Sequence, residues 1–168
     1  MTRVPIPTQL DHVLEANARF VEQFDAGDLP LPPARRLAIV ACMDARLDPA
    51  AVLGLHIGDA HVIRNAGGLA TDDAIPSLVI SQHLLGTQEV LVIEHTNCGM
   101  LTFEDEPVRR QIAETQGADA DLPLLPFPDL ESNLRAQVER IREHAWIRDV
   151  PVSGLVYEVE TGRLRRVA

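Results

Sequence analysis

The chain has 168 residues and a net charge of −10, with 46% apolar and 24% charged residues, a composition typical of one globular domain. The negative charge excludes nucleic acid and anionic membranes as partners, because both need a basic face on the protein. No apolar run is long enough to cross a bilayer and no signal segment is evident, so we expect a cytoplasmic protein.

The first predicted element is a helix over residues 8–26. Thr8 is followed three residues later by Asp11, which is close to a capping box, and Gly27 is a typical terminator. Apolar residues recur at helical spacing between them. The helix precedes the predicted core, so its apolar face can fold back on its own domain or lie across a second subunit.

The rest of the chain alternates buried strands with helices. In chain order we expect a strand at 37–42, a short helix at 49–55, a strand at 60–64, a helix from 72 or 73 to 85, a strand at 89–94, helical sequence after 99, a helix at 129–145, a strand at 154–160 and a closing strand at 163–167. This order predicts an α/β fold, with a mostly parallel sheet and an antiparallel closing strand, in a single domain spanning 1–168.

Two cysteines and one histidine lie where two of these strands end. Cys42 ends the first strand, His95 follows the strand that begins at Glu89, and Cys98 lies three residues further. Ligands bind beyond the carboxyl ends of parallel strands where the strand order reverses. Thiolate and imidazole suit zinc, and three protein ligands leave one tetrahedral position open, as in catalytic sites. The alternative is a buried histidine and two free thiols.

A charged pair follows the first cysteine, in the sequence Cys42-Met43-Asp44-Ala45-Arg46. A carboxylate here can accept the proton of a zinc-bound water, and the arginine can keep that carboxylate ionised through a bidentate pair. We also expect Cys98 to lie at a helix N-terminus, where the helix dipole favours the thiolate. The alternative for the charged pair is a surface ion pair that caps the next helix.

Three blocks of the sequence carry a resemblance to a known family. Residues 42–46 (CMDAR), 64–67 (RNAG) and 95–99 (HTNCG) resemble the signature blocks of the β-class carbonic anhydrases, in their order and separations. The tail from 154 to 164 resembles the closing strand of that family. The chain is most similar to the short archaeal and actinobacterial members.

The resemblance implies a zinc lyase that reversibly hydrates carbon dioxide to bicarbonate and a proton. The implied residues are Cys42, His95 and Cys98 for one zinc ion per chain, Asp44 and Arg46 as the catalytic pair, and Arg64 and Gly67 beside the substrate pocket. A structural ion pair is an equal alternative for Arg64.

The family is built on homodimers, in some cases paired into tetramers, in which the N-terminal helix packs against the partner. The helix at 8–26 suits that role. In some members the equivalent of Asp44 leaves its arginine and becomes the fourth zinc ligand. The regulatory bicarbonate pocket of those members uses an aromatic residue and an arginine, and here the single Trp and Tyr fall late, at Trp146 and Tyr157. We therefore expect the open form.

Three other functions compete with this interpretation. An enzyme on the same scaffold could hydrolyse carbonyl sulfide or carbon disulfide, because pocket shape selects the substrate. A non-catalytic zinc-binding dimer would have lost Asp44 or Arg46, and both are present. A thiol redox protein usually carries Cys-x-x-Cys, whereas Cys42 and Cys98 lie far apart in the sequence.

Overall fold

The computed structural model describes residues 8–117 and 122–168, which belong to two compact units, Met1–Pro30 and Leu31–Ala168. The residues between 117 and 122 lie in the loop expected before the last helix, and that part of the loop is outside the described residues. Among the described residues, no helix is both long and apolar enough to cross a membrane.

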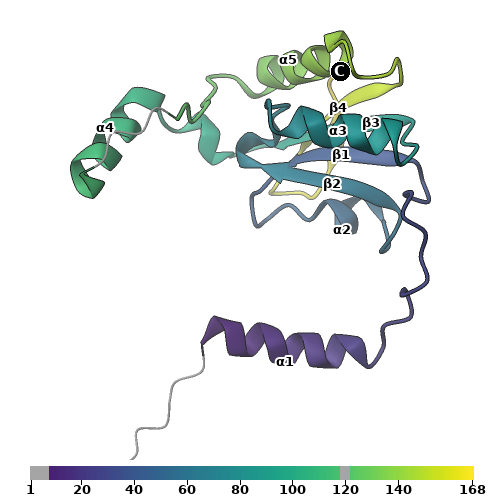
Figure 1. Cartoon of the computed structure of the whole chain (residues 1–168). Helices are drawn as coiled ribbons and strands as arrows, with labels where there is room; N and C mark the ends of the chain where they lie inside the picture. The colour runs from purple at the N-terminus through teal and green to yellow at the C-terminus, as the bar shows by residue number, and fades with distance from the viewer. Residues whose placement is uncertain (1–7, 118–121) are drawn as a thin grey trace, which may run out of the picture. The chain divides into compact units, whose positions relative to one another are not determined.

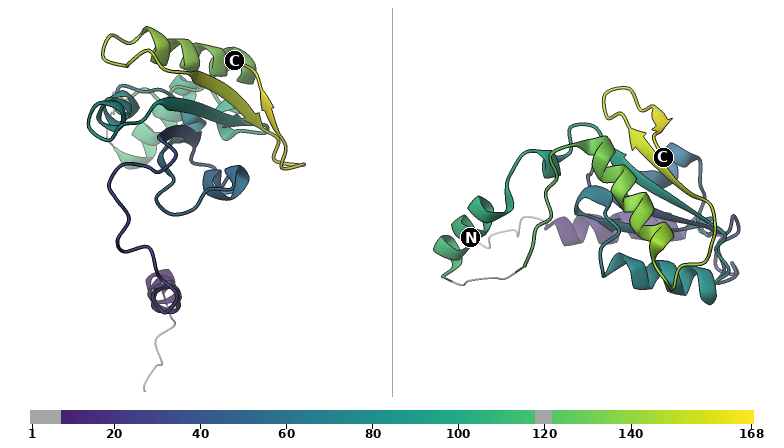
Figure 2. Two further views of the ribbon diagram at one scale, coloured as in Figure 1. Left: turned by 90° about the vertical axis from the view of Figure 1, so that its right-hand side faces the viewer. Right: turned by 90° about the horizontal axis from the view of Figure 1, so that it is seen from above.

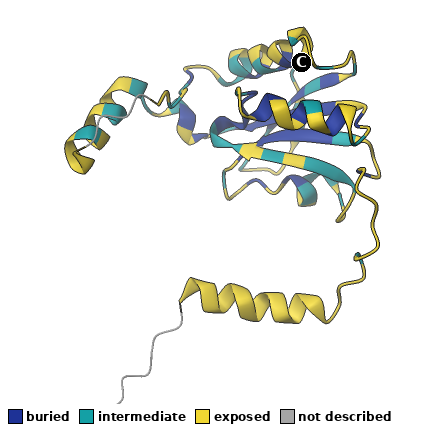
Figure 3. Cartoon of the chain, viewed as in Figure 1, coloured by how far each residue is buried: buried dark blue, intermediate teal, exposed yellow. Residues whose placement is uncertain are grey.

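The described part of the first unit, residues 8–30, contains the helix α1 (Gln9–Val21). The predicted capping box is confirmed: the Thr8 hydroxyl accepts from the amide of Asp11, and the Asp11 carboxylate accepts from the amide of Thr8. The helix ends at Val21 and not at residue 26, since Asp and Gly in the segment 25–28 are poor helix formers. No residue of α1 is buried (Figure 3).

The second unit is built on a five-stranded sheet. Its strands are β1 (Leu37–Cys42), β2 (Ala60–Asn65), β3 (Glu89–His95), β4 (Val152–Tyr157) and β5 (Leu164–Arg166). They lie in the order β2-β1-β3-β4-β5, and the first four are parallel while β5 is antiparallel to β4. The predicted α/β fold with an antiparallel closing strand is confirmed. β4 begins two residues earlier than expected, because Val152 pairs with Val90 of β3.

Helices cover both faces of this sheet (Figures 1 and 2). The helices of the unit are α2 (Pro49–Leu53), α3 (Ala74–His83), α4 (Asp105–Gln116) and α5 (Leu130–Glu143), with short 3-10 turns η1 (Ala66–Gly68) and η2 (Gly99–Leu101). On one face, Leu78 of α3 and Leu134 of α5 pack with Val40 and Val92. On the other face, Leu47 and Met100 pack with Ile39 and Ile93. The central strand β1 reads as a continuous apolar run, LAIVAC, because both of its faces are covered.

Gly68, at the end of η1, lies against the backbone of two strands. It has φ +72°, and a Cβ atom there would lie 2.8 Å from the Cys42 nitrogen and 2.8 Å from the Ile93 oxygen. Backbone atoms of two paired strands cannot move aside cheaply. This close contact fixes the 66–68 turn against the ends of β1 and β3.

We predict that Gly68→Ala destabilises the protein by about 3 kcal/mol or more, because the new Cβ collides with backbone as well as disfavouring the positive φ. Gly86→Ala is the matched control: Gly86 has φ +76° and no atom within 4 Å of an added Cβ, so only the backbone preference is lost, about 1 kcal/mol. Urea unfolding measures both. Equal losses of free energy would contradict the close-contact argument.

Candidate metal centre

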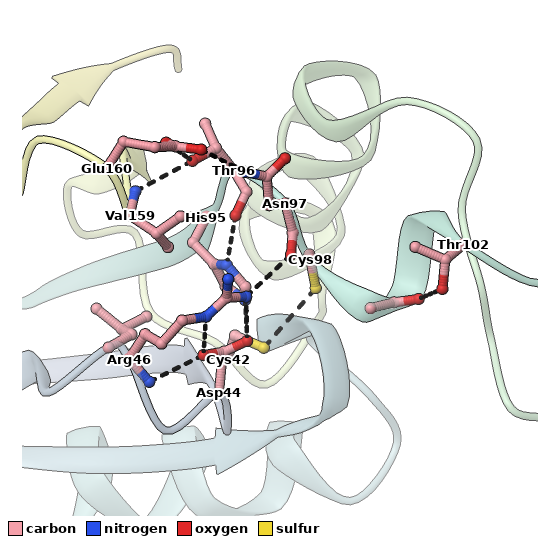
Figure 4. Close-up of polar contacts among 12 residues, drawn as sticks. Cys42, Asp44, Arg46, His95, Thr96, Asn97, Cys98, Thr102, Val159 and Glu160 are labelled. Atoms are coloured by element: carbon pink, nitrogen blue, oxygen red, sulfur yellow. Dashed lines mark hydrogen bonds and ion pairs between the residues drawn. The ribbon is translucent and has the colours of Figure 1, made fainter.

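Three donor side chains meet beyond the ends of two neighbouring strands (Figure 4). β1 and β3 pair in parallel, and the strand order reverses between them because β2 lies on the far side of β1. Cys42 is the last residue of β1 and His95 the last of β3, while Cys98 follows in the tight connection. One ligand atom from each of these three residues lies within 4.8 Å of the others, and all three side chains are buried.

The spacing and the free valences of these atoms fit a tetrahedral metal ion. The two Sγ atoms lie 3.9 Å apart, close to the ~3.8 Å expected for two thiolates on one zinc ion with bonds of about 2.3 Å. His95 Nδ1 lies 2.8 Å from the Thr96 carbonyl oxygen and donates a hydrogen bond to it, because a carbonyl oxygen can only accept. Nε2 is then an acceptor, and it is buried without a hydrogen-bond partner among the described residues. Such an orientation is typical of a metal-ligating histidine.

The hydrogen bond between the two thiols shifts their pKa values in opposite directions. The hydrogen bond from Cys98 lowers the pKa of Cys42 most, and contacts with His95 and the backbone of Asp44 and Gly67 lower it further. The same hydrogen bond raises the pKa of Cys98, which keeps the shared proton, and burial adds to this effect. The two sulfurs are thus joined by one S–H···S hydrogen bond. A metal ion bound to both sulfurs takes the place of the proton between them, since metal ligation requires both thiolates.

The predicted helix N-terminus at Cys98 is only partly present. Cys98 caps η2, a single 3-10 turn, and the next helix, α4, begins at Asp105. A turn of three residues has little dipole, so local contacts replace the expected helix effect. The backbone amide of Met100 lowers the pKa of Cys98 and is the contact that the sequence pattern did not indicate.

Asp44 and Arg46 form a bidentate pair beside the three donors. Arg46 Nε lies 2.9 Å from Asp44 Oδ1 and Nη2 lies 2.7 Å from Oδ2, and the Arg46 amide also donates to Oδ1. These hydrogen bonds hold the pKa of Asp44 well below its usual range. Asp44 Oδ2 lies 3.6 Å from His95 Nε2. An ionised carboxylate is thus fixed at the edge of the donor set, where it can only accept hydrogen bonds.

Arg64 supports the loop that carries this pair. Its guanidinium donates to three backbone carbonyls, those of Cys42, Asp44 and Leu47, at 2.8–3.1 Å. Such a fork can fix a loop whose carbonyls point to one side. Gly67, predicted beside the pocket, is buried with φ +86° and its backbone lowers the pKa of Cys42. Both residues therefore act on the donor loop through backbone contacts.

The sequence pattern did not indicate the role of the Asn97 backbone. Its carbonyl accepts a hydrogen bond from Arg46 Nη2 at 2.9 Å. Asn97 has φ +53°, a left-handed conformation that Asn adopts more readily than most residues. An Asn immediately before Cys-Gly in a short connection was the signal available for this conformation.

Comparisons with known proteins point to one family. A sequence profile of the family described as carbonic anhydrase matches residues 37–164. β-Carbonic anhydrase 1 of Mycobacterium tuberculosis is 44% identical over 161 residues, covering 95% of this chain and 98% of that protein. Carbon disulfide hydrolase of Acidithiobacillus thiooxidans is 36% identical, covering 94% and 88%. The structure of carbonic anhydrase from Streptococcus mutans has a TM-score of 0.92 and 43% identity, covering 98% and 100%.

Proposed function

Because the chain belongs to the carbonic anhydrase family and matches β-class members over nearly its whole length, we propose that it hydrates carbon dioxide reversibly to bicarbonate and a proton. Cys42, His95 and Cys98 hold one zinc ion per chain in this proposal. The observation that carries it is the ionised Asp44–Arg46 pair beside three donors that leave one coordination position open. A structural zinc site would need a fourth protein ligand.

Each group has a distinct task in the reaction. Zinc, when bound, is a Lewis acid that lowers the pKa of water to near neutrality. Asp44 accepts the hydrogen of the attacking water, because its ionised carboxylate has no proton to donate. This orients the lone pair of the water toward carbon dioxide. Arg46 keeps Asp44 ionised and fixed in direction, so the pair is poised before substrate enters.

Arg64 and Gly67 shape the surroundings of the reaction. Arg64 fixes the loop from Cys42 to Leu47 through its three carbonyl contacts. Gly67, in the small-residue turn η1, lets Phe127 and Leu69 pack against the turn, because a Cβ atom there would lie 3.1–3.3 Å from their side chains. We assign Arg64 to holding this loop, with its charge adding local attraction for the bicarbonate anion.

A second candidate substrate is carbon disulfide. The relative from Acidithiobacillus thiooxidans that bears this name is similar over most of its length. The same attack by an oriented water would serve carbonyl sulfide and carbon disulfide. A carboxylate held by an arginine is compatible with all three substrates, so the assay has to compare them.

We infer that residues 1–168 act as one domain in a homodimer, with α1 as the arm that meets the second copy. Six apolar side chains of this segment are 46–63% exposed: Leu10, Val13, Leu14, Phe20, Val21 and Phe24. A helix of 13 residues is marginal alone, and its apolar stripe needs a covering surface. We place the enzyme in the cytoplasm, where two cysteine ligands stay reduced.

We predict that the zinc-loaded protein hydrates carbon dioxide in a stopped-flow assay with a pH indicator, and that Asp44→Asn lowers kcat about 100-fold while zinc stays bound. The amide can donate a hydrogen bond where the carboxylate only accepts, so the water is misoriented. Asp73→Asn, a change of equal charge at an exposed helix cap that makes no side-chain capping bond, should match the unchanged protein.

Full activity in Asp44→Asn would remove Asp44 from the reaction. Hydrolysis of carbon disulfide by the unchanged protein, with no hydration of carbon dioxide, would replace the proposed substrate by the sulfur analogue. Absence of both activities in protein with one zinc per chain would support the non-catalytic alternative.

For the dimer, we predict that Leu14→Glu, in the centre of the apolar stripe of α1, lowers the mass measured by light scattering from two chains toward one. A charge at this position opposes burial of the stripe. His12→Glu is the control, since residue 12 lies on the opposite face at 100° per residue. A two-chain mass in both variants would contradict the assignment of α1 to the interface.

A further inference from the structure

The turn between β4 and β5 is joined to the loop that carries Cys98 (Figure 4). Thr96 Oγ1 donates to Glu160 Oε2 at 3.1 Å, and Asn97 Nδ2 donates to Glu160 Oε1. The amide of Val159 donates to Thr96 Oγ1 at 3.1 Å. Two segments far apart in the sequence are thus connected by three hydrogen bonds, and Glu160 accepts two of them.

These contacts act on the backbone of Asn97. Its left-handed conformation, at φ +53°, is disfavoured for residues with a Cβ. The side-chain amide bound to Glu160 holds the residue in this conformation. The Asn97 carbonyl then lies 2.9 Å from Arg46 Nη2 and accepts its hydrogen bond.

Arg46 connects the Asn97 carbonyl to the Asp44 carboxylate. The same Nη2 that donates to Asn97 also donates to Asp44 Oδ2 at 2.7 Å. The Arg46 side chain is about half exposed, so without the Asn97 carbonyl only its two contacts with Asp44 oppose a change of rotamer. Fixing Nη2 from two sides selects the rotamer in which the guanidinium meets the carboxylate in parallel.

We propose that Glu160 is a positioning residue for the reaction: it fixes Asn97, the Asn97 carbonyl fixes Arg46, and Arg46 fixes Asp44. The inference rests on the proposed role of the Asp44–Arg46 pair. The competing explanation is that Glu160 only stabilises the β4–β5 turn.

A substitution of Glu158 can distinguish the two explanations, because Glu158 lies in the same turn as Glu160. It accepts from Thr161 Oγ1 at 2.8 Å and its Oε1 lies 3.9 Å from Arg165 Nε. These contacts support the turn itself and do not involve the Asn97 loop. Glu158→Ala is therefore the matched control for Glu160→Ala.

The experiment compares these variants as zinc-loaded, full-length protein. The first readout is the NMR signal of Arg46 Nε–Hε, identified by its loss in Arg46→Lys, because this group donates to Asp44 Oδ1 at 2.9 Å. In Glu160→Ala we expect the signal to shift toward that of a free guanidinium and to exchange faster with water, with zinc content unchanged. We expect the wild-type signal in Glu158→Ala and in Glu160→Gln, which keeps the shape of the contact.

The second readout is catalysis. Glu160→Ala should lower kcat about tenfold with KM nearly unchanged, and Glu160→Gln should restore most of it. Asn97→Gly removes the same side-chain contact without opposing the left-handed backbone, so it should repeat the loss, and combining it with Glu160→Ala should add little.

An unchanged Arg46 signal in Glu160→Ala, or equal changes in Glu160→Ala and Glu158→Ala, would overturn the proposal. If the wild-type protein shows no hydration activity while the Arg46 signal responds as expected, the positioning of Arg46 stands and the proposed reaction fails. The two failures are therefore distinguishable.

Discussion

The parallel pairing of β1 with β3 is the constraint on which the site depends. It brings the end of β1 next to the end of β3, so that Cys42 lies near Cys98 although 56 positions separate them in the sequence. The glycine turn at 66–68 closes against both strand ends, because only a residue without Cβ fits next to the Cys42 nitrogen and the Ile93 oxygen. The donor atoms are thus placed by the stiffest part of the fold, as a site that must hold a fixed coordination geometry requires.

Around the donors, backbone carbonyls and two arginines hold the loops. Arg64 collects three carbonyls of the first loop, while Arg46 joins Asp44 of that loop to the Asn97 carbonyl of the second. Each guanidinium donates to acceptors that the fold holds in place, so the position and orientation of its charge are set before any substrate arrives. The oriented carboxylate beside the donor set suits a reaction in which water attacks a small neutral substrate.

Much of the fold and of the donor set could be predicted from local sequence patterns. The apolar run at 37–42 coincides with β1, the cap at Thr8 is present, and the resemblance to carbonic anhydrases is confirmed by relatives over nearly the full length. The contacts of Arg64 and Glu160 could not be predicted, because they join segments distant in the sequence through carbonyls and loop geometry. The helical sequence expected after Gly99 begins as a single 3-10 turn and continues as α4 only from Asp105, since apolar spacing in a short segment does not define where a helix starts.

The most direct test of the central claim is X-ray absorption at the zinc edge of the purified protein. We predict one zinc per chain with two sulfur ligands at about 2.3 Å, one histidine nitrogen at about 2.0 Å and one further light atom. Cys98→Ala should lose the stoichiometric zinc, whereas His56→Ala, at an exposed histidine outside the donor set, should retain it with the same spectrum. A spectrum with no sulfur ligands, or stoichiometric zinc in Cys98→Ala, would contradict the account.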